Sequence, residues 1–446
     1  MRGWKTLPVL LVLLFTASTS FAAGFRLPEA GAKAMGMGFA FTAQADDPSA
    51  IYFNPAGLTQ LKGQNIMVGV TYVRENGGEF NGLTPVDNNV PLTSGGFTNQ
   101  KSETQKSLNF YIPNAYWTRT TNSGNVSYGV GIFAPFGLGQ EYKDKNTSIF
   151  RNQITKIDLQ TVVVNPTIAF KINEYLSVGV GIDWMYGKAE LAKTPWNPAL
   201  VPVALNGNVY NLDLEGDGDA WGYNFGILLK PTPNLRFGAN YRSPFNLEIK
   251  DGDVNLSNIN PAVQAAFGGS SFGTKGGATI KMPATFALGV SYTMDRLTVN
   301  VDADWTFWHS FDSLPITFAN PVPGPGGTFL LPPTSVSPKD WEDVVAFRIG
   351  AEYRVTDPLA LRVGFVYDPT PVPAATMGPE LPDATRLNYM VGAGYKVGPW
   401  TIDGAFMYVD KFDRTVNNLS VAALTGFNGT WTGDAWLVGM DVGYHF

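Results

Sequence analysis

The sequence predicts an all-β protein, a 14-stranded antiparallel transmembrane β-barrel with an N-terminal hatch (plug) inside the lumen. Three observations predict it. The chain begins with an export signal, segments of about ten residues alternate in polarity from residue 65 onward, and the connections between them alternate in length. The expected organisation is a signal peptide over 1–22, a hatch over 23–64 and the 14-stranded outer-membrane β-barrel over 65–446.

The first residues have the three parts of a secretory signal. Arg2 and Lys5 precede an almost wholly apolar run, Leu7–Ala17, and small residues follow, with Ser20 and Ala22 placed for cleavage after Ala22. The apolar run has about ten residues, too few to cross a membrane as a helix, which needs about 20. We therefore expect an exported protein.

The composition narrows the class further. The chain is 44% hydrophobic and 15% charged, it has no Cys, and its net charge is −6. Without Cys an exported chain has no disulfide framework, and without basic clusters it has no nucleic-acid surface. Stability must come from a core or from a membrane acting as the apolar phase.

The alternation itself predicts strands whose two faces have different surroundings, one apolar and one polar. In "FRIGAEYRV", Phe347, Ile349 and Tyr353 share one face, while Arg348 and Arg354 share the other. Fourteen segments follow this pattern: 65–75, 107–120, 125–139, 157–171, 174–190, 219–230, 234–249, 279–292, 296–309, 343–355, 359–368, 385–396, 399–410 and 435–446.

The connections alternate between short turns and long loops. The short ones are 121–124, 231–233, 293–295, 356–358 and the junction at Gly398 and Pro399. The long ones are 76–106, 140–156, 191–218, 250–278, 310–342, 369–384 and 411–434. This layout, with an even number of strands, is typical of Gram-negative outer-membrane barrels. A soluble periplasmic sandwich or propeller would also have one apolar face per strand.

Aromatic residues favour the barrel over the soluble alternative. They flank the apolar faces, as at interfacial girdles. The last strand, "WLVGMDVGYHF", alternates aromatic and apolar side chains and ends on Phe446, which is typical of the signal read by the barrel-assembly machinery. Outer-membrane lipid and lipopolysaccharide are then expected surroundings.

Residues typical of catalysis or metal binding are sparse. His309 and Ser310 are neighbours on an expected strand and point to opposite faces, which is not the geometry of a nucleophile and its base. "DLEGDGD" (213–219) lacks the spacing of an EF-hand and is interpreted as a solvated loop, with a surface cation site as the alternative. We expect no enzyme activity, no catalytic residues, no cofactor and no metal.

The chain resembles a known family over essentially the whole mature length. The segments that carry the resemblance are "AGFRLPEAGAKAMGMGFAFTAQADDPSAIYFNPAGL" (23–58), "VVVNPTIAFKINEYLSVGVGIDWMYGKAEL" (162–191), residues 218–252 and "YDPTPVPAATMGPELPDATRLNYMVGAGY" (367–395). They resemble the FadL family, outer-membrane transporters of long-chain fatty acids and other hydrophobic compounds. The expected fourteen strands agree with that family.

The resemblance implies a gating hatch and a sideways exit. The hatch residues it implies are Asp46, Asp47, Asn54, Pro55 and Ala56. We expect a turn of helix to start after Asp47, an extended Asn54, and packing of residues 54–56 where the third strand bends. That strand, "NVSYGVGIFAPFGLGQ", contains a proline that cannot donate to a ladder, so a bulge or gap is expected at Ala134, Pro135, Phe136 and Gly137. A proline that merely ends the strand is the alternative.

Ligand contacts are expected in the outer loops and among inward cations. Apolar candidates are Leu200 and Val203 in one long loop and Ile259, Val263 and Phe267 in the next, where 258–267 is expected to form a short amphipathic helix. Packing within the loops is the alternative. Cationic candidates for a carboxylate headgroup are Lys188 and Lys339 by resemblance, and Arg348, Arg362 and Arg386 by periodicity, although a lumenal charge network would also use these arginines.

The leading hypothesis is passive, hatch-gated transport of long-chain fatty acids or similar hydrophobic compounds. An uptake channel for aromatic hydrocarbons is the alternative within the family. A general porin and an adhesive surface protein are less favoured, because a plug blocks steady conductance and the resemblance is to transporters.

Overall fold

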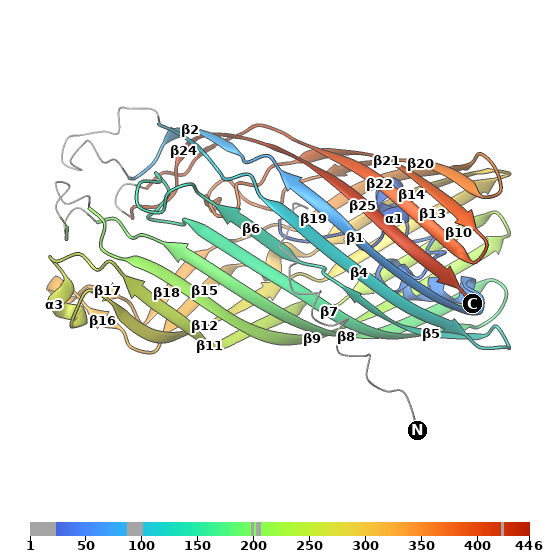
Figure 1. Cartoon of the computed structure of the whole chain (residues 1–446), viewed down its shortest axis with the longest axis horizontal. Helices are drawn as coiled ribbons and strands as arrows, with labels where there is room; N and C mark the ends of the chain where they lie inside the picture. The colour runs from blue at the N-terminus through green and yellow to red at the C-terminus, as the bar shows by residue number, and fades with distance from the viewer. Residues whose placement is uncertain (1–23, 87–100, 198–199, 202–206, 421–422) are drawn as a thin grey trace, which may run out of the picture.

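The computed structural model describes residues 24–86, 101–197, 200–201, 207–420 and 423–446. The expected signal peptide, residues 1–22, lies outside the described residues. The described part is an elongated barrel whose strands cross its long axis obliquely (Figure 1). No helix in the described part is long and apolar enough to span a bilayer.

Fourteen strand positions make up the wall. Nine are single strands: β1 (Gln64–Glu75), β4 (Asn109–Thr120), β7 (Lys156–Lys171), β8 (Leu176–Lys193), β9 (Asn211–Thr232), β20 (Leu359–Asp368), β21 (Arg386–Val397), β22 (Trp400–Lys411) and β25 (Asp434–His445). Five are interrupted and form pairs: β5 (Val126–Phe133) with β6 (Gly137–Glu141), β10 (Leu235–Arg242) with β11 (Phe245–Ser257), β12 (Phe272–Met282) with β13 (Thr285–Met294), β14 (Leu297–Thr306) with β15 (Ser313–Phe318), and β18 (Thr334–Pro338) with β19 (Val344–Arg354).

The wall closes on itself. β1 pairs with β4 on one side and with the last strand, β25, on the other, both antiparallel. Closure leaves no free sheet edge along this seam, as a spanning sheet in lipid requires. The predicted all-β, 14-stranded antiparallel barrel is confirmed, and each predicted strand segment coincides with an observed one.

The strands are longer than the sequence predicted at the outer end. β8 continues to Lys193 and β9 begins at Asn211, so both ends of the predicted long loop 191–218 belong to strands, and the prediction that "DLEGDGD" lies in a loop is wrong. β11 likewise runs to Ser257 and β12 starts at Phe272 inside the predicted loop 250–278. Main-chain pairing continues beyond the apolar band because it depends on the neighbouring strand rather than on lipid, whereas the sequence pattern reports only the side chains.

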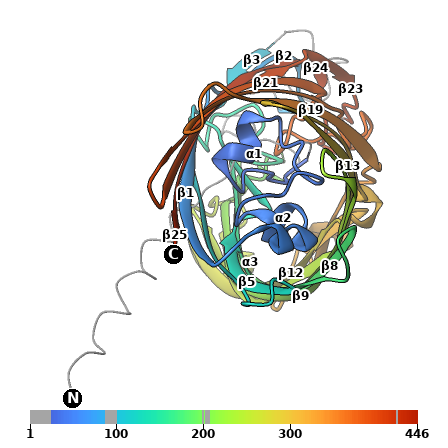
Figure 2. The same cartoon turned by 90° about the vertical axis from the view of Figure 1, so that its right-hand side faces the viewer.

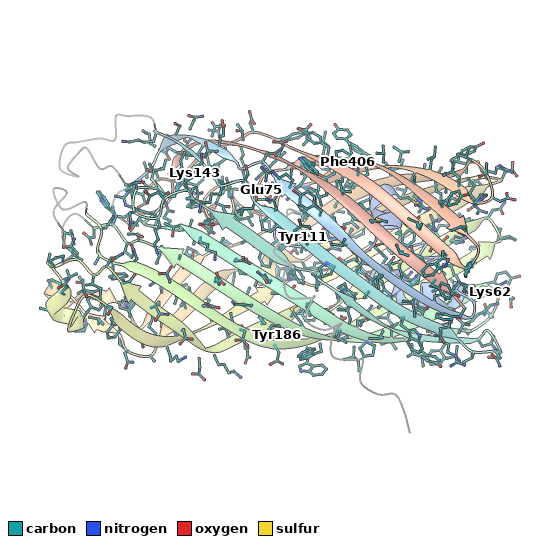
Figure 3. The ribbon with its side chains drawn as sticks, in the orientation of Figure 1. Lys62, Glu75, Tyr111, Lys143, Tyr186 and Phe406 are labelled. Atoms are coloured by element: carbon teal, nitrogen blue, oxygen red, sulfur yellow. The ribbon has the colours of Figure 1, made fainter. Side chains whose placement is uncertain are left out.

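The two faces of the wall differ as the alternation predicts. Val363 and Val391 are each 56% exposed on the outer face, while Asn300 and Asp302 are each 1% exposed on the inner face. Figure 3 places Tyr111 and Phe406 along the strands, between Lys143 near one end and Lys62 at the other. The outer face is therefore apolar, whereas the inner face carries polar and charged side chains together with buried apolar ones.

Short strands and a short helix lie at the outer end of the barrel. β2 (Glu79–Leu83), β3 (Lys101–Thr104), β23 (Arg414–Asn417) and β24 (Asn428–Thr432) form a separate four-stranded sheet. β16 (Val322–Pro323) pairs with β17 (Phe329–Leu331), with the turn η5 (Pro325–Gly327) between them. The helix α3 (Gln264–Phe267) is shorter than the predicted 258–267, since residues 261–263 form a turn.

Residues 24–63 are called the lumenal segment below, because residues 24–58 are buried or half-buried and enter the barrel, while Lys62 and Gly63 are exposed at its end. Figure 2 shows its helices α1 (Ala32–Gly36) and α2 (Ala50–Phe53) within the ring of strands. Asp47 Oδ1 accepts a hydrogen bond from Ser49 N at 2.8 Å, which starts the turn before α2. Asn54 is extended (φ −169°, ψ 103°) and begins the 3-10 helix η2 (Pro55–Gln60), as the following proline predicts.

Candidate functional site

Buried charges hold the lumenal segment to the wall. Asp304 on β14 accepts two hydrogen bonds from Arg26, each 2.9 Å, and pairs with Arg348 at 2.8 Å. Asp302 on the same strand accepts from Thr42 N at 2.8 Å. Breaking a buried ion pair leaves an uncompensated charge, so these contacts fix the position of the segment strongly.

The other inward arginines are also paired. Arg362 contacts Glu352 at 2.7 Å and Asp403 at 2.6 Å. Arg386 contacts Asp383 at 2.8 Å. The inward orientation that periodicity predicts for these residues is observed, and their partners place them in a lumenal charge network. A role in ligand binding stays a prediction.

Asn54 anchors the lumenal segment at a different place from the one predicted. Its Nδ2 donates to Thr42 O at 2.8 Å and to Ile227 O on β9 at 2.9 Å. A Cβ on Gly226 would lie 2.1 Å from Asn54 Oδ1, and one on Gly179 would lie 2.5 Å from Pro55 C. Residues 54–56 therefore pack against β8 and β9, and the prediction that they lie at the bend of the third strand is wrong. The sequence could not show which wall strand the plug faces.

The third strand is interrupted as Pro135 predicts, and this interruption is called the β4/β6 gap. The β4–β5 ladder ends with Ala115 opposite Ile132, and main-chain contact resumes where Lys106 N donates to Glu141 O at 2.9 Å. Between these points Ala134, Pro135, Phe136 and Gly137 form a bulge that carries one residue more than the facing stretch of β7.

The start of the lumenal segment fills this gap. Leu27 N donates to Pro135 O at 2.8 Å, Gly137 N donates to Phe25 O at 2.9 Å, and Arg26 forms an antiparallel bridge with Phe136. The segment thus supplies main-chain partners that the missing strand pairing would otherwise leave open.

Phe25 lies at the centre of an aromatic cluster. Its ring centroid is 6.1 Å from Phe136, 4.7 Å from Trp308, 5.3 Å from Phe311 and 5.5 Å from Trp341. Trp308 lies in the turn η4 (Trp308–Ser310), which separates β14 from β15. One side chain therefore contacts both the bulge in the third strand and the interruption of the ninth.

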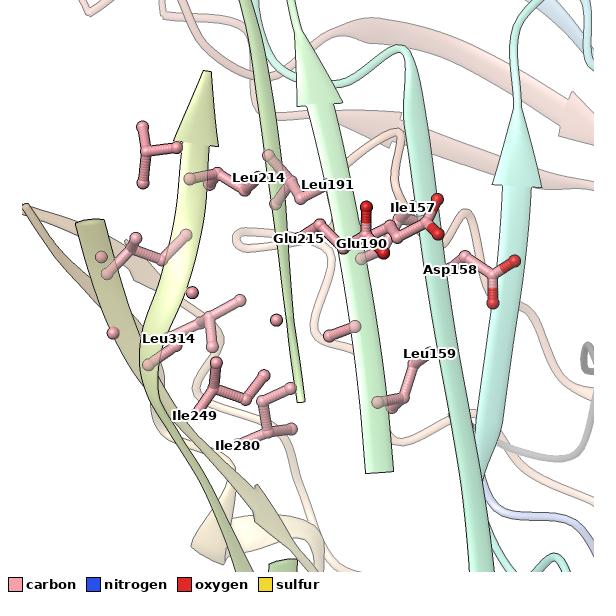
Figure 4. A pocket seen from close by; sticks show the side chains of 18 of the residues that line it. Ile157, Asp158, Leu159, Glu190, Leu191, Leu214, Glu215, Ile249, Ile280 and Leu314 are labelled. Atoms are coloured by element: carbon pink, nitrogen blue, oxygen red, sulfur yellow. The ribbon is translucent and has the colours of Figure 1, made fainter. Parts of the chain in front are cut away.

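Above Phe25 lies a cavity of about 110 Å³, called cavity A. Figure 4 shows apolar side chains converging on it from several strands, among them Leu159, Leu191, Ile249, Ile280 and Leu314. The charged residues among its lining are all acidic: Asp158, Glu190, Glu215 and Asp253. Such a lining suits an uncharged hydrocarbon portion of a ligand.

A second cavity of about 350 Å³, cavity B, shares Phe25 and Leu314 with cavity A and extends outward. Two lysines line it. Lys339 is 6% exposed and pairs with Glu380. Lys193 points inward from the end of β8, and no carboxylate among the described residues lies in ion-pair contact with it. Lys193 is therefore the lysine of cavity B that remains available to an anion.

The predicted apolar loop contacts gather in one outer cluster. Ile259 is 2% exposed, Val263 and Phe267 are each 8% exposed, and Leu200 packs against them together with Tyr210. Val203 lies outside the described residues. The structure brings the two predicted loops together, and packing within the loops remains compatible with this arrangement.

Two carboxyl groups of the lumenal segment are unusual acids. Burial raises the pKa of Glu29 to about 8, despite Arg348 and Arg386 nearby, and neither carboxyl oxygen has a hydrogen-bond partner among the described residues. Burial likewise raises the pKa of Asp47 to about 6, opposed by Lys33. Glu29 is consequently mostly protonated at neutral pH.

Comparison with known proteins decides the family. Residues 13–446 match the family model described as outer membrane protein transport protein (OMPP1/FadL/TodX). The chain belongs to this family. The long-chain fatty acid transport protein of Escherichia coli O6:H1 is 25% identical over 99% of this chain and 98% of its own length. Outer membrane protein P1 of Haemophilus influenzae is 24% identical, with 97% of each chain covered.

Solved structures of the FadL family share the fold. A Pseudomonas aeruginosa FadL homologue superposes with a TM-score of 0.79 at 20% identity, over 95% of this chain and all of the other. The Pseudomonas putida toluene transporter TodX gives 0.69 at 17% identity, over 94% and 99%. The protein is thus an outer-membrane transporter of hydrophobic compounds, not an enzyme.

In this FadL-family barrel one predicted headgroup ligand faces away from the lumen, and two residues that line the cavities were missed in the sequence analysis. Lys188 alternates with inward Met185, faces outward, and pairs with Glu215 at 2.5 Å and Glu190 at 3.3 Å, so the prediction of an inward headgroup ligand at Lys188 is wrong. The missed residues are Phe25 and Lys193. Parity along β8 would have placed Lys193 inward had the strand been extended three residues further.

Proposed function

We propose that this protein takes up long-chain fatty acids by passive diffusion gated by the lumenal segment, which acts as a hatch. The observation that carries the proposal is the position of Phe25. It forms the floor of cavities A and B, and its main chain, with that of Leu27, fills the β4/β6 gap. A ligand that displaces Phe25 from its cavity floor also removes the main chain that seals the wall.

The cavities suggest a route through the protein. An acyl chain first meets the outer apolar cluster around Ile259 and Phe267, then enters cavity B and extends into cavity A. Departure of residues 25–27 would let it leave sideways, between β4 and β6. Exit into the membrane suits a ligand that water dissolves poorly.

Lys193 supplies the headgroup contact in this proposal. A carboxylate beside an unpaired, partly buried ammonium gains a charge-assisted hydrogen bond. The paired Lys339 offers less, because its charge is already compensated by Glu380. The lining of cavity A contains no cationic side chain, whereas Lys193 and Lys339 line cavity B, which favours a pose with the headgroup in cavity B and the chain in cavity A.

Uptake of radiolabelled oleate by cells with and without the protein tests the function, and equal rates would contradict it. Lys193→Met should raise the oleate concentration needed for half-maximal uptake by about tenfold, the loss of roughly one charged hydrogen bond. Lys188→Met is the matched control, since Lys188 faces outward, and it should leave uptake unchanged.

The hatch assignment has its own test. Asn54→Ala leaves the buried carbonyls of Thr42 and Ile227 without their donor, which costs about 1–3 kcal/mol for each unsatisfied group. Uptake should fall or leak should rise, while heat-modifiable migration in gels shows an assembled barrel. Asn122→Ala, in an exposed turn, is the control. An unchanged phenotype would make the segment a passive filler.

Aromatic hydrocarbons are the second candidate. The apolar lining of cavity A, where every charged residue is acidic, would serve a neutral ligand equally well. Toluene uptake that persists in Lys193→Met, together with oleate uptake that is absent in the parent protein, would favour this candidate.

A further inference from the structure

The wall has a second interruption, between the outer halves of the eighth and ninth strands. The β13–β14 ladder ends with Thr285 opposite Thr306, and one more bond follows from Phe307 N to Ala284 O at 3.0 Å. Pairing of the outer halves, β12 with β15, covers only Gly276–Ala278 against Ile316–Phe318. Residues 279–283 and 308–315 therefore face each other outside either ladder, and this stretch is called the β12/β15 seam.

Prolines explain why the ladder stops here. Pro315 would be the next residue of β15 opposite Thr279, and it has no N–H to donate. Pro283 ends β12 at the other limit of the seam, and Pro244 interrupts the neighbouring strand between β10 and β11 at the same level. The turn η4 then carries the ninth strand out of register. The positions of these prolines in the sequence therefore determine where the seam lies.

The inner side of the seam is cavity A. Ala278 and Ile280 on one edge, and Leu314 and Ile316 on the other, all line that cavity. In Figure 4, Leu314 and Ile280 project toward the same space from facing strands. Unpaired main chain in a barrel wall is tolerated where it borders a cavity, so the seam and the cavity are parts of one feature.

The outer side of the seam lies at the boundary between apolar and polar bands. Just below it the rings of Phe286 and Trp305 are in tilted contact on the outer face, with centroids 5.8 Å apart, as in an interfacial girdle. Within the seam, Lys281 and Asp312 form an ion pair at 2.8 Å, with side chains 42% and 56% exposed. An exposed pair of this kind is weak and screened by salt, so it closes the seam without locking it.

From this geometry we infer that the β12/β15 seam is a second lateral portal, through which an acyl chain already dissolved in the outer leaflet enters cavity A directly. A fatty acid at the membrane surface keeps its carboxylate at the polar boundary and its chain in the apolar band, which is the level of the seam. The inference rests on the proposed transport function and adds an entrance to it. The β4/β6 gap remains the exit.

The absence of native Cys allows a reversible test. A short bifunctional thiol reagent should bridge Lys281→Cys with Asp312→Cys across the seam. Thr415→Cys with Thr430→Cys is the matched control, because these exposed side chains are also in contact, with their hydroxyl oxygens 2.7 Å apart, but sit opposite each other in the intact β23–β24 ladder and line neither cavity. Bridging the seam should lower oleate uptake toward that of cells without the protein, and a reductant should restore it.

A labelling experiment tests the portal independently of transport. A diazirine-bearing fatty acid, partitioned into the membrane of proteoliposomes, should label peptides containing Ile280 or Leu314, and bridging the seam should abolish that label. Complete bridging with unchanged uptake and unchanged labelling would overturn the portal, and so would equal losses at both Cys pairs. A third outcome distinguishes the two proposals. If bridging the seam abolishes the labelling but the parent protein takes up no oleate, the portal is supported and the proposed function is overturned.

Discussion

The β4/β6 gap and the β12/β15 seam are two interruptions of one wall, closed in different ways. In the gap, Leu27 and Gly137 take part in hydrogen bonds that join the lumenal segment to the bulged strand. In the seam, Ile280 and Leu314 face a cavity and an exposed ion pair spans the outside. A main-chain closure requires a segment to leave before the wall opens, whereas a side-chain closure requires only rotamer changes.

Phe25 connects the two closures, and its replacement should have the largest effect. Phe25→Ala removes the ring that contacts Phe136 on one side and Trp308 on the other, at a cost of about 3–5 kcal/mol of packing. We expect frequent channel openings in planar bilayers and sensitivity to bulky antibiotics. Phe170→Ala, on the outer face, should show neither. Identical conductance of the two variants would contradict the claim that Phe25 connects the two closures.

A change confined to the gap should have the next largest effect. Leu27→Pro removes the N–H that donates to Pro135 O, a loss of about 1–3 kcal/mol for the unsatisfied carbonyl. The lumenal segment should detach more often, and limited proteolysis in detergent should cut it faster. The parent protein and Phe170→Ala serve as controls. Unchanged cleavage would mean that side chains, not the main chain, close the gap.

Glu29, two residues beyond Leu27, should make the gap sensitive to pH. Its pKa is raised to about 8 by burial, so the neutral acid stabilises the docked segment at low pH, and that stability is lost as pH rises from about 4.5 through about 8. Leak conductance of the parent protein should therefore increase toward pH 9. Glu29→Gln should flatten this dependence, and a parallel rise in the variant would assign it to another group.

The smallest effect is expected at the exposed ion pair of the seam. Lys281→Met removes a contact worth about 0–1 kcal/mol, so the midpoint of thermal unfolding should change little. Oleate uptake from a preloaded membrane should be equal to or slightly faster than that of the parent. A marked loss of uptake would mean that Lys281 contacts the ligand rather than closing the seam.

The fold was predictable because lipid imposes a simple rule on each strand. Phe347 and Arg348 had to face opposite solvents, and the same alternation located all fourteen segments. Where lipid no longer acts, as around Lys193 and Asn211, the pattern stopped but main-chain pairing did not. That difference also explains why Lys193 was missed, whereas Lys188 lay within the predicted strand and was assigned to the lumen by resemblance rather than by its position in the alternation.

The site was predictable only in part. Pro135 revealed the bulge, because a missing N–H is a local property of the residue. The contacts of Asn54 with β9, and of Phe25 with four aromatic rings, join residues far apart in the chain, and no local pattern encodes which wall strand a plug residue meets. Pro283 and Pro315 each predict a local break in a strand. That the two breaks face each other follows only from the register between the strands, which the sequence does not give.

Locking the lumenal segment to the wall tests the central claim most directly. Arg26 and Phe136 face each other in an antiparallel bridge, a spacing that suits a disulfide, so Arg26→Cys with Phe136→Cys should form one in a chain that has no other thiol. The measurement is oleate uptake by the oxidised and the reduced forms of this single variant. The account predicts uptake abolished by oxidation and recovered on reduction, whereas equal uptake by both forms would contradict exit through the β4/β6 gap.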